Sequence, residues 1–170
     1  APVAGPDAVD ALGPEDTTPP GVTFVVPADW KATVVHSFGF RNVGPYGEQQ
    51  PCVAWSLHNE APLYVNAVTL SNDGGFHHSN WFVVPEDAFP GPDGFFKCGD
   101  RDFQEIGAAI EGTVIFAQST QSQSETQQLP EGVVIKVPPK HKIIATTHVL
   151  NLSSDSISSE IRMSLDIIHP

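Results

Sequence analysis

Positively charged side chains are scarce in this sequence. Its 170 residues include only eight Lys and Arg against twenty Asp and Glu, so the formal charge is −12. Proteins that bind nucleic acid or an anionic membrane surface need clustered cations to neutralise phosphate groups. The composition therefore argues against both kinds of partner.

Long apolar runs are also missing. A helix that crosses a bilayer needs about 20 consecutive apolar residues, and no run in the sequence approaches that length. A basic segment followed by an apolar core, which marks a signal peptide, does not occur in it either. We expect no membrane span in this chain.

Motifs of two large enzyme classes are absent as well. The sequence contains neither the G-x-S-x-G segment of serine hydrolases nor a glycine loop of the kind that cradles phosphate. Acidic side chains that could form a glycosidase pair are plentiful, but in so acidic a chain most of them are expected to be solvated surface. Candidates for chemistry are therefore sought among the cysteines and histidines.

Cysteine occurs twice, as Cys52 and Cys98. If the two are joined, the chain-entropy model gives about 4 kcal/mol of stabilisation for a loop of that size, and the compartment is oxidising. Two buried free thiols in a cytosolic protein are the alternative. Residues 1–20 favour the disulfide, because their Pro-rich and acidic composition is typical of a flexible tether on an exported protein, trimmed after export or attached to a lipid anchor.

Short β-branched and aromatic segments separated by turn formers fill the rest of the chain, with little helical periodicity. We expect strands at 22–26, 32–40, 52–57, 63–70, 78–84, 112–117, 132–137, 142–152 and 159–168. Strands at this spacing predict an all-β protein, an antiparallel β-sandwich or jelly roll, with a single domain over 21–170.

Two segments are expected to lie outside these strands. Residues 85–103 predict a long loop that its phenylalanines pin to the sandwich, and that could roof a substrate cleft. Residues 119–128, "STQSQSETQQ", predict a mobile polar excursion with no chemistry of its own.

The segment "NDGGFHHSNW" contains the adjacent histidines His77 and His78. Successive side chains of a regular strand point to opposite faces, so both can reach one metal ion only where the strand is bulged or strongly twisted. Gly74 and Gly75 directly precede the pair and permit such a distortion. The pair is therefore a candidate for shared metal ligation.

His148 is the best candidate for a third ligand. It lies in the expected strand "KIIATTHVLNL", among apolar residues on both faces. A histidine in such surroundings needs a partner for its ring nitrogens. A metal ion and a backbone carbonyl are both consistent with this position.

Taken together, these features resemble the N-terminal domain of the copper type II, ascorbate-dependent monooxygenases, which include peptidylglycine α-hydroxylating and dopamine β-monooxygenases. The resemblance rests on Cys52, the His77-His78 pair, Cys98, the "LPEGV" strand and His148, and it extends from about residue 22 to the last strand "SEIRMSLDII". It implies a jelly-roll sandwich, a disulfide between the two cysteines, and one copper ion held by the three histidines.

Enzymes of that family have a second domain, whose copper is held by an H-x-H pair and a methionine. The present sequence contains no H-x-H, and its one methionine, Met163, lies in the expected last strand. The resemblance therefore implies the electron-transfer half, with ascorbate or a similar small reductant and dioxygen as partners. A second copper would have to come from a partner protein or a second subunit.

The leading hypothesis is thus an exported, redox-active mononuclear copper protein related to monooxygenases. Zinc fits three histidines nearly as well as copper. The alternatives are a non-catalytic copper carrier or sensor at the cell envelope, and a sandwich that serves as a binding module.

Overall fold

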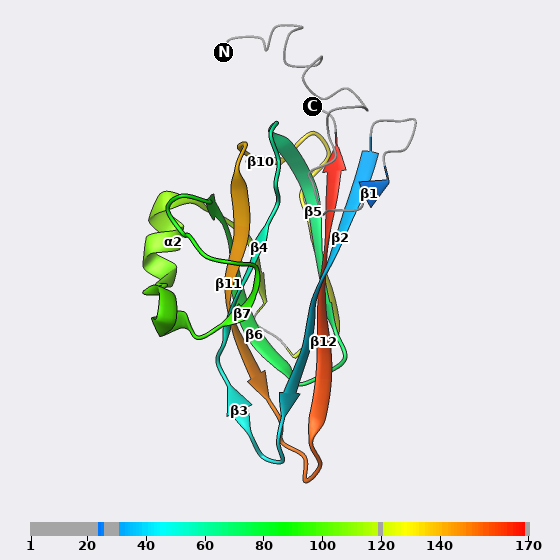
Figure 1. Cartoon of the computed structure of the whole chain (residues 1–170). Coiled ribbons are helices and arrows are strands. Elements are labelled where there is room, and N and C mark those ends of the chain that lie inside the picture. The colour runs from blue at the N-terminus through cyan, green and yellow to red at the C-terminus, as the bar shows by residue number, and fades with distance from the viewer. Residues whose placement is uncertain (1–23, 26–30, 119–120, 169–170) are drawn as a thin grey trace, which may run out of the picture.

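The computed structural model describes residues 24–25, 31–118 and 121–168. These residues form two antiparallel sheets packed face to face, with two short helices outside one of the sheets (Figure 1). The expected tether at 1–20 lies outside the described residues. Among the described residues, no helix is long and apolar enough to span a bilayer.

The first sheet, sheet A, has six strands. In spatial order they are β1 (Phe24–Val25), β2 (Lys31–Val43), β12 (Ile157–Ile168), β5 (Leu63–Asn72) and β10 (Ile135–Val137), with β9 (Ser124–Gln128) also paired to β5. The long strands β2 and β12 pair along almost their whole length.

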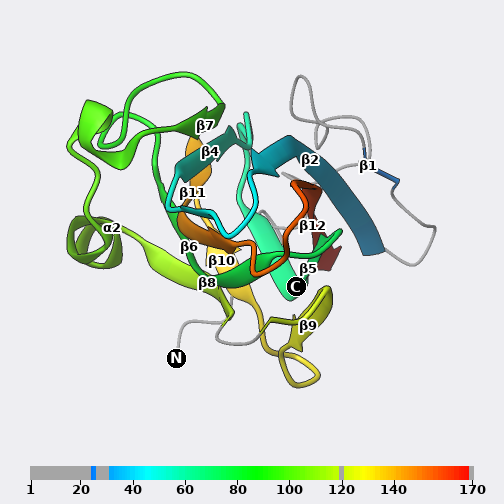
Figure 2. The same cartoon turned by 90° about the horizontal axis from the view of Figure 1, so that it is seen from below.

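The second sheet, sheet B, also has six strands. In spatial order they are β7 (Gly94–Phe96), β4 (Cys52–Ser56), β11 (His141–Leu150), β6 (Phe76–Pro85) and β8 (Thr113–Gln118), with β3 (Glu48–Gln49) also paired to β11. The chain crosses repeatedly between the sheets, which Figure 2 shows as two layers. The strand orders β2-β12-β5-β10 and β4-β11-β6-β8 are those of a jelly roll, so the expected fold is confirmed.

The space between the sheets holds the main hydrophobic core. Period-two alternation along each strand turns every second side chain inward. The largest of the fully buried side chains are Trp55, Trp81, Phe76, Phe116, Leu57, Leu70, Ile143, Ile161, Met163 and Leu165. Sheet B has a second apolar cluster on its outer face, which is formed by Cys52, Ala54, Phe82, Val84, Phe103, Ala108 and Ile144.

The segment 85–103 packs against that outer face, as expected, with Phe89 and Phe96 against the second cluster. It is less irregular than predicted, because it contains β7 and a 3-10 helix, η1 (Cys98–Arg101). An α-helix, α2 (Glu105–Glu111), follows it on the same side of sheet B (Figure 1). Sequence periodicity could not find α2, since Ile106 and Ile110 are exposed in it and only Ala108 is buried.

The segment 119–128 differs from the expectation. Residues 124–128 form β9, which adds to β5 with Thr69 paired to Thr126. The threonine hydroxyls of this pair lie 2.8 Å apart. A polar strand on an exposed sheet edge has no hydrophobic alternation, so its pairing left no pattern in the sequence. Residues 119–120 lie outside the described residues.

Candidate metal centre

A tight turn leads into the histidine pair. Gly74 and Gly75 both have positive φ, at 115° and 75°, which other residues adopt at a cost. The side chain of Asn72 accepts a hydrogen bond from the N–H of Gly74 at 2.9 Å, and Leu150 N–H donates to Gly75 O at 2.7 Å. A Cβ on Gly75 would lie 2.3 Å from Cδ1 of Ile157, so this turn requires glycine.

The strand is bulged at His77, a distortion that the preceding glycines permit. β6 pairs His78 with His148 and Phe76 with Val149, which leaves His77 as an extra residue in β6. In such a bulge two successive residues face one residue of the partner strand. Phe76 can therefore stay in the core, where it is 1% exposed, while both histidines lie next to His148.

The three imidazoles meet edge to face on the outer side of sheet B. Their ring centroids are 5.1 Å apart for His77 and His78, 4.9 Å for His77 and His148, and 4.7 Å for His78 and His148. One nitrogen from each ring lies within 4.8 Å of the others. Nδ1 of His148 and Nε2 of His78 are 2.9 Å apart and share a hydrogen bond.

This arrangement fits a metal ion with nitrogen ligands. Three nitrogens at about 2.0–2.1 Å from one ion lie roughly 3–4 Å from one another, which the observed cluster approaches. Nδ1 of His77 is buried without a hydrogen-bond partner, and a buried polar atom without a partner is costly. An ion bound by the three rings would remove that cost.

The electrostatics favour a neutral ring at His78. Although His78 is an exposed residue, partial burial of its ring and then the charges of His148 and His77 lower the pKa of His78, while Glu105 raises it. Metal ligation requires a neutral imidazole. A lowered pKa keeps this ring neutral at physiological pH, so a proton does not compete with the ion.

A carboxylate that sequence reasoning missed touches the cluster. Oε1 of Glu48 lies 2.6 Å from Nε2 of His148 and accepts a hydrogen bond from Nε2 of Gln50 at 3.1 Å. The bond from Gln50, followed by the contact with His148, lowers the pKa of Glu48. Nothing in the sequence around Glu48 indicates this role, because it arises from the pairing of β3 with β11.

Three other histidines lie away from the cluster. His36 stacks on Trp55, with ring centroids 4.4 Å apart. His58 is exposed, and His141 begins β11 with its Nδ1 2.9 Å from Pro139 O. His169 lies outside the described residues.

Both cysteines form one disulfide, Cys52–Cys98, with Cα atoms 5.1 Å apart. The pairing implied by the family resemblance is therefore confirmed, and the alternative of two free thiols is wrong. The bond joins the start of β4 to η1. Because neither cysteine is a thiol, neither offers a thiolate ligand to the histidine cluster.

A hollow of about 590 Å³ lies at the start of β6 and the end of β11, and none of the three clustered histidines lines it. It is lined by Gly74, Gly75, Phe76, Gln121, Gln123, Leu150, Asn151, Leu152, Ser153 and Ile157. No residue of 85–103 lines it. The expectation that this segment roofs a cleft at the metal is not met, because its apolar side chains cover the other half of the sheet.

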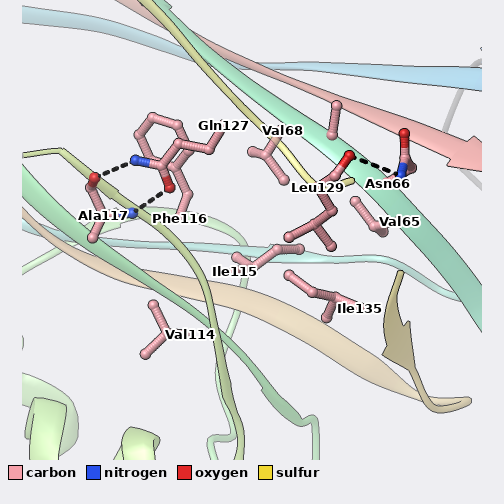
Figure 3. A pocket seen from close by; sticks show the side chains of 11 residues that line it. Val65, Asn66, Val68, Val114, Ile115, Phe116, Ala117, Gln127, Leu129 and Ile135 are labelled. Atoms are coloured by element: carbon pink, nitrogen blue, oxygen red, sulfur yellow. Dashed lines mark hydrogen bonds between the residues drawn. The ribbon is translucent and has the colours of Figure 1, made fainter. Parts of the chain in front are cut away.

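Another hollow, of about 220 Å³, lies between β5 and β8 (Figure 3). Its walls are mostly apolar. Two amides in its lining are already engaged: Gln127 exchanges hydrogen bonds with the backbone of Ala117, and Asn66 donates to Val133 O at 2.8 Å. No titratable side chain lines this hollow, so it offers no group for acid–base or metal chemistry.

Comparisons with known proteins add little to this picture. No family model and no curated protein matches the chain. Similar solved structures include the Drosophila melanogaster CENP-C cumin domain, which is 9% identical with a TM-score of 0.18 over 97% of this chain and 84% of that one. Drosophila melanogaster CENP-C bound to CAL1 is also 9% identical, with a TM-score of 0.18 over 90% of this chain and 86% of that one. Likeness at this level carries no argument about function, so the conclusion of the site's geometry is a three-histidine centre able to hold a metal ion on a jelly roll.

Proposed function

We propose that this chain is a mononuclear copper protein whose ion cycles between Cu(I) and Cu(II). The observation that carries the proposal is the bulge at His77, which brings two successive histidines of β6 next to His148 of β11. The bulge keeps Phe76 in the core and at the same time places both His77 and His78 on the outer face beside His148. It is the distortion that shared ligation requires.

The donor set supports copper. Imidazole suits copper, zinc, iron and nickel, whereas carboxylate-rich sites suit magnesium and calcium. Three neutral imidazoles can hold both oxidation states of copper, and the bound ion would supply one-electron chemistry. Zinc is the competing metal for the same ligands.

The residues at the site would have different roles. His77, His78 and His148 bind the ion, and the paired strands β6 and β11 hold the rings at fixed distances. The exposed side of His78 leaves the ion accessible from solvent. Access of this kind suits exchange of electrons with a small reductant such as ascorbate, and reaction with dioxygen.

Monooxygenase chemistry in the resembling family uses two copper ions. Among the described residues, the three histidines are the candidate cluster for a metal. We therefore propose that this chain acts as an electron-transfer copper domain, and that any hydroxylation draws its second copper from a partner or another subunit.

We also propose that the protein is exported. The Cys52–Cys98 disulfide supports this, since disulfides persist in oxidising compartments. Residues 1–20 would then act as a tether at the cell envelope.

The proposal is tested by titrating metal-free protein with Cu(II), recording electron paramagnetic resonance, and then measuring oxygen uptake with ascorbate. We expect one equivalent of copper, hyperfine structure from nitrogen ligands, and consumption of oxygen. One equivalent without oxygen uptake would instead support the carrier or sensor, and absence of binding would overturn the metal site.

A matched pair of variants tests the ligands. His148→Ala should weaken copper binding by orders of magnitude, because it removes one of three ligands. His141→Ala should leave binding unchanged, because His141 lies at the opposite end of the same strand. Equal effects of the two substitutions would contradict the assignment.

A further inference from the structure

The ring of His148 lies between two different neighbours. Nδ1 faces Nε2 of His78 at 2.9 Å, and Nε2 lies 2.6 Å from Oε1 of Glu48. The Nε2 atom is buried, and its N–H direction does not meet regular hydrogen-bond geometry toward Glu48. At this distance a small rotation of the half-exposed Glu48 carboxylate aligns it with the N–H of Nε2.

Backbone pairing keeps Glu48 at this position. The two-residue strand β3 pairs Glu48 with Leu150, two residues beyond His148 on the same face of β11. Asn151 N–H donates to Gly47 O at 2.9 Å, which anchors the chain just before Glu48. Nε2 of Gln50 then donates a hydrogen bond to Oε1 of Glu48 and holds the carboxylate in place.

A ligating histidine has one nitrogen for the ion and one N–H that needs an acceptor. A carboxylate or carbonyl in that second place fixes the tautomer and the ring orientation, and it raises the basicity of the ligand. A charged acceptor does this more strongly than a neutral one. Glu48 is correctly placed to accept from Nε2 and to leave the lone pair of Nδ1 directed at the other two rings.

We propose that Glu48 is a positioning residue for the metal, which keeps the proton of His148 on Nε2 and presents Nδ1 to the ion. The inference rests on the proposed function, since it concerns the ion held by the three histidines. It also has an electronic consequence: the negative charge behind His148 favours Cu(II) over Cu(I), so its removal should raise the reduction potential.

The test compares Cu(II) affinity, measured by chelator competition, in the wild type, Glu48→Ala and Glu48→Gln. Loss of such an outer partner typically weakens metal binding about 10–100-fold, and we expect that range for Glu48→Ala. Glu48→Gln keeps an acceptor of the same shape without the charge, so its loss should be smaller. Glu60→Ala, which removes an exposed carboxylate at the His141 end of β11, is the matched control and should bind as the wild type does.

Pulsed electron paramagnetic resonance gives a readout that a merely structural role would not change. It detects the ring nitrogen that does not bind copper, whose quadrupole coupling depends on its hydrogen bond. We expect the signal of one imidazole in three to shift in Glu48→Gln and Glu48→Ala, and none to shift in Glu60→Ala.

The outcomes separate the two proposals. A wild-type protein that binds no copper overturns the proposed function and this inference with it. Normal copper binding in the wild type, with unchanged affinity and unchanged remote-nitrogen signals in both Glu48 variants, overturns the role of Glu48 alone. If Glu48→Ala does not fold, the isosteric Glu48→Gln decides the question by itself.

Discussion

Two halves of one sheet face differ sharply in this molecule. On the outer face of sheet B, β11 and β6 pair Ile144 with Phe82 at one end and His148 with His78 four residues further along. The first pair is buried beneath the segment 85–103 and α2. The second pair is part of the histidine cluster and includes an exposed residue.

The boundary between the halves lies at Asn80. Its side chain donates to both carboxylate oxygens of Glu105, at 3.2 Å each, at the first residue of α2. Beyond this contact the histidines are not covered by the segment 85–103 or by α2. The same pair of strands can therefore serve as core on one half and as a ligand platform on the other, because what covers a face decides which side chains it can carry.

The largest expected effect on stability comes from removing the disulfide that attaches the segment 85–103 to sheet B. Replacing both cysteines in Cys52→Ala/Cys98→Ala removes the link that holds η1 to β4, which the chain-entropy model values at about 4 kcal/mol. We expect the melting temperature to fall by roughly 8–16 °C. Differential scanning calorimetry measures this change.

The same variant should still bind copper with wild-type affinity at a temperature where it is folded. The positions of the three histidines depend on the register between β6 and β11 and not on the segment 85–103. A double variant that keeps its melting temperature, or one that folds but has lost the copper site, would contradict this separation of the halves.

A smaller effect is expected on the uncovered half, where bound metal should supply stability. A ligand that binds only the native state at 100 times its dissociation constant adds about 2.7 kcal/mol. Copper should therefore raise the free energy of unfolding of the wild type by about that amount, and a chelator should reverse it. Urea titration with and without copper measures the change.

His148→Ala serves as the control for this measurement, because it should show little stabilisation by copper. Equal stabilisation of the variant and the wild type would mean that copper binds elsewhere on the molecule.

The smallest effect concerns Lys142, which is 2% exposed on the covered half. Its Nζ donates to Gly91 O at 3.0 Å. Burial lowers its pKa from 10.5, Asp93 and Glu86 raise it, and Arg101 lowers it. Between the lowered folded pKa and 10.5 the unfolded chain binds more protons, so the free energy of unfolding should increase as the pH rises through that window.

Urea unfolding from about pH 8 to pH 10.5 measures this dependence. Lys142→Met should lose the increase, whereas Lys136→Met, at an exposed position, should keep it. If the free energy of unfolding of the wild type does not rise over this pH range, Lys142 remains hydrated beneath the segment 85–103.

Several features of the site could be predicted before the structure. The glycines before His77 permitted a distorted strand, and the structure has a bulge there. For His148 the sequence left two partners open, a metal ion and a backbone carbonyl. Its register opposite His78 places it in the histidine cluster. The disulfide depended on the family resemblance, because two cysteines in a sequence do not report their distance.

Other features had no local signal. β9 is polar, α2 exposes its isoleucines, and β3 has only two residues, so none of them shows the alternation from which elements are inferred. Glu48 belongs to this group. Its contact with His148 joins residues 100 positions apart, and no pattern near either residue predicts it.

By itself the sequence determined the all-β character and the glycine turn that permits a distorted histidine strand, and it made His77, His78 and His148 the candidate ligands, because alternation, turn residues and glycine conformations are local properties. Only the tertiary structure decided which half of the sheet is covered, which histidines meet, and which carboxylate lies behind His148. These depend on strand register and on what packs over each face, and both are settled by contacts between segments far apart in the chain.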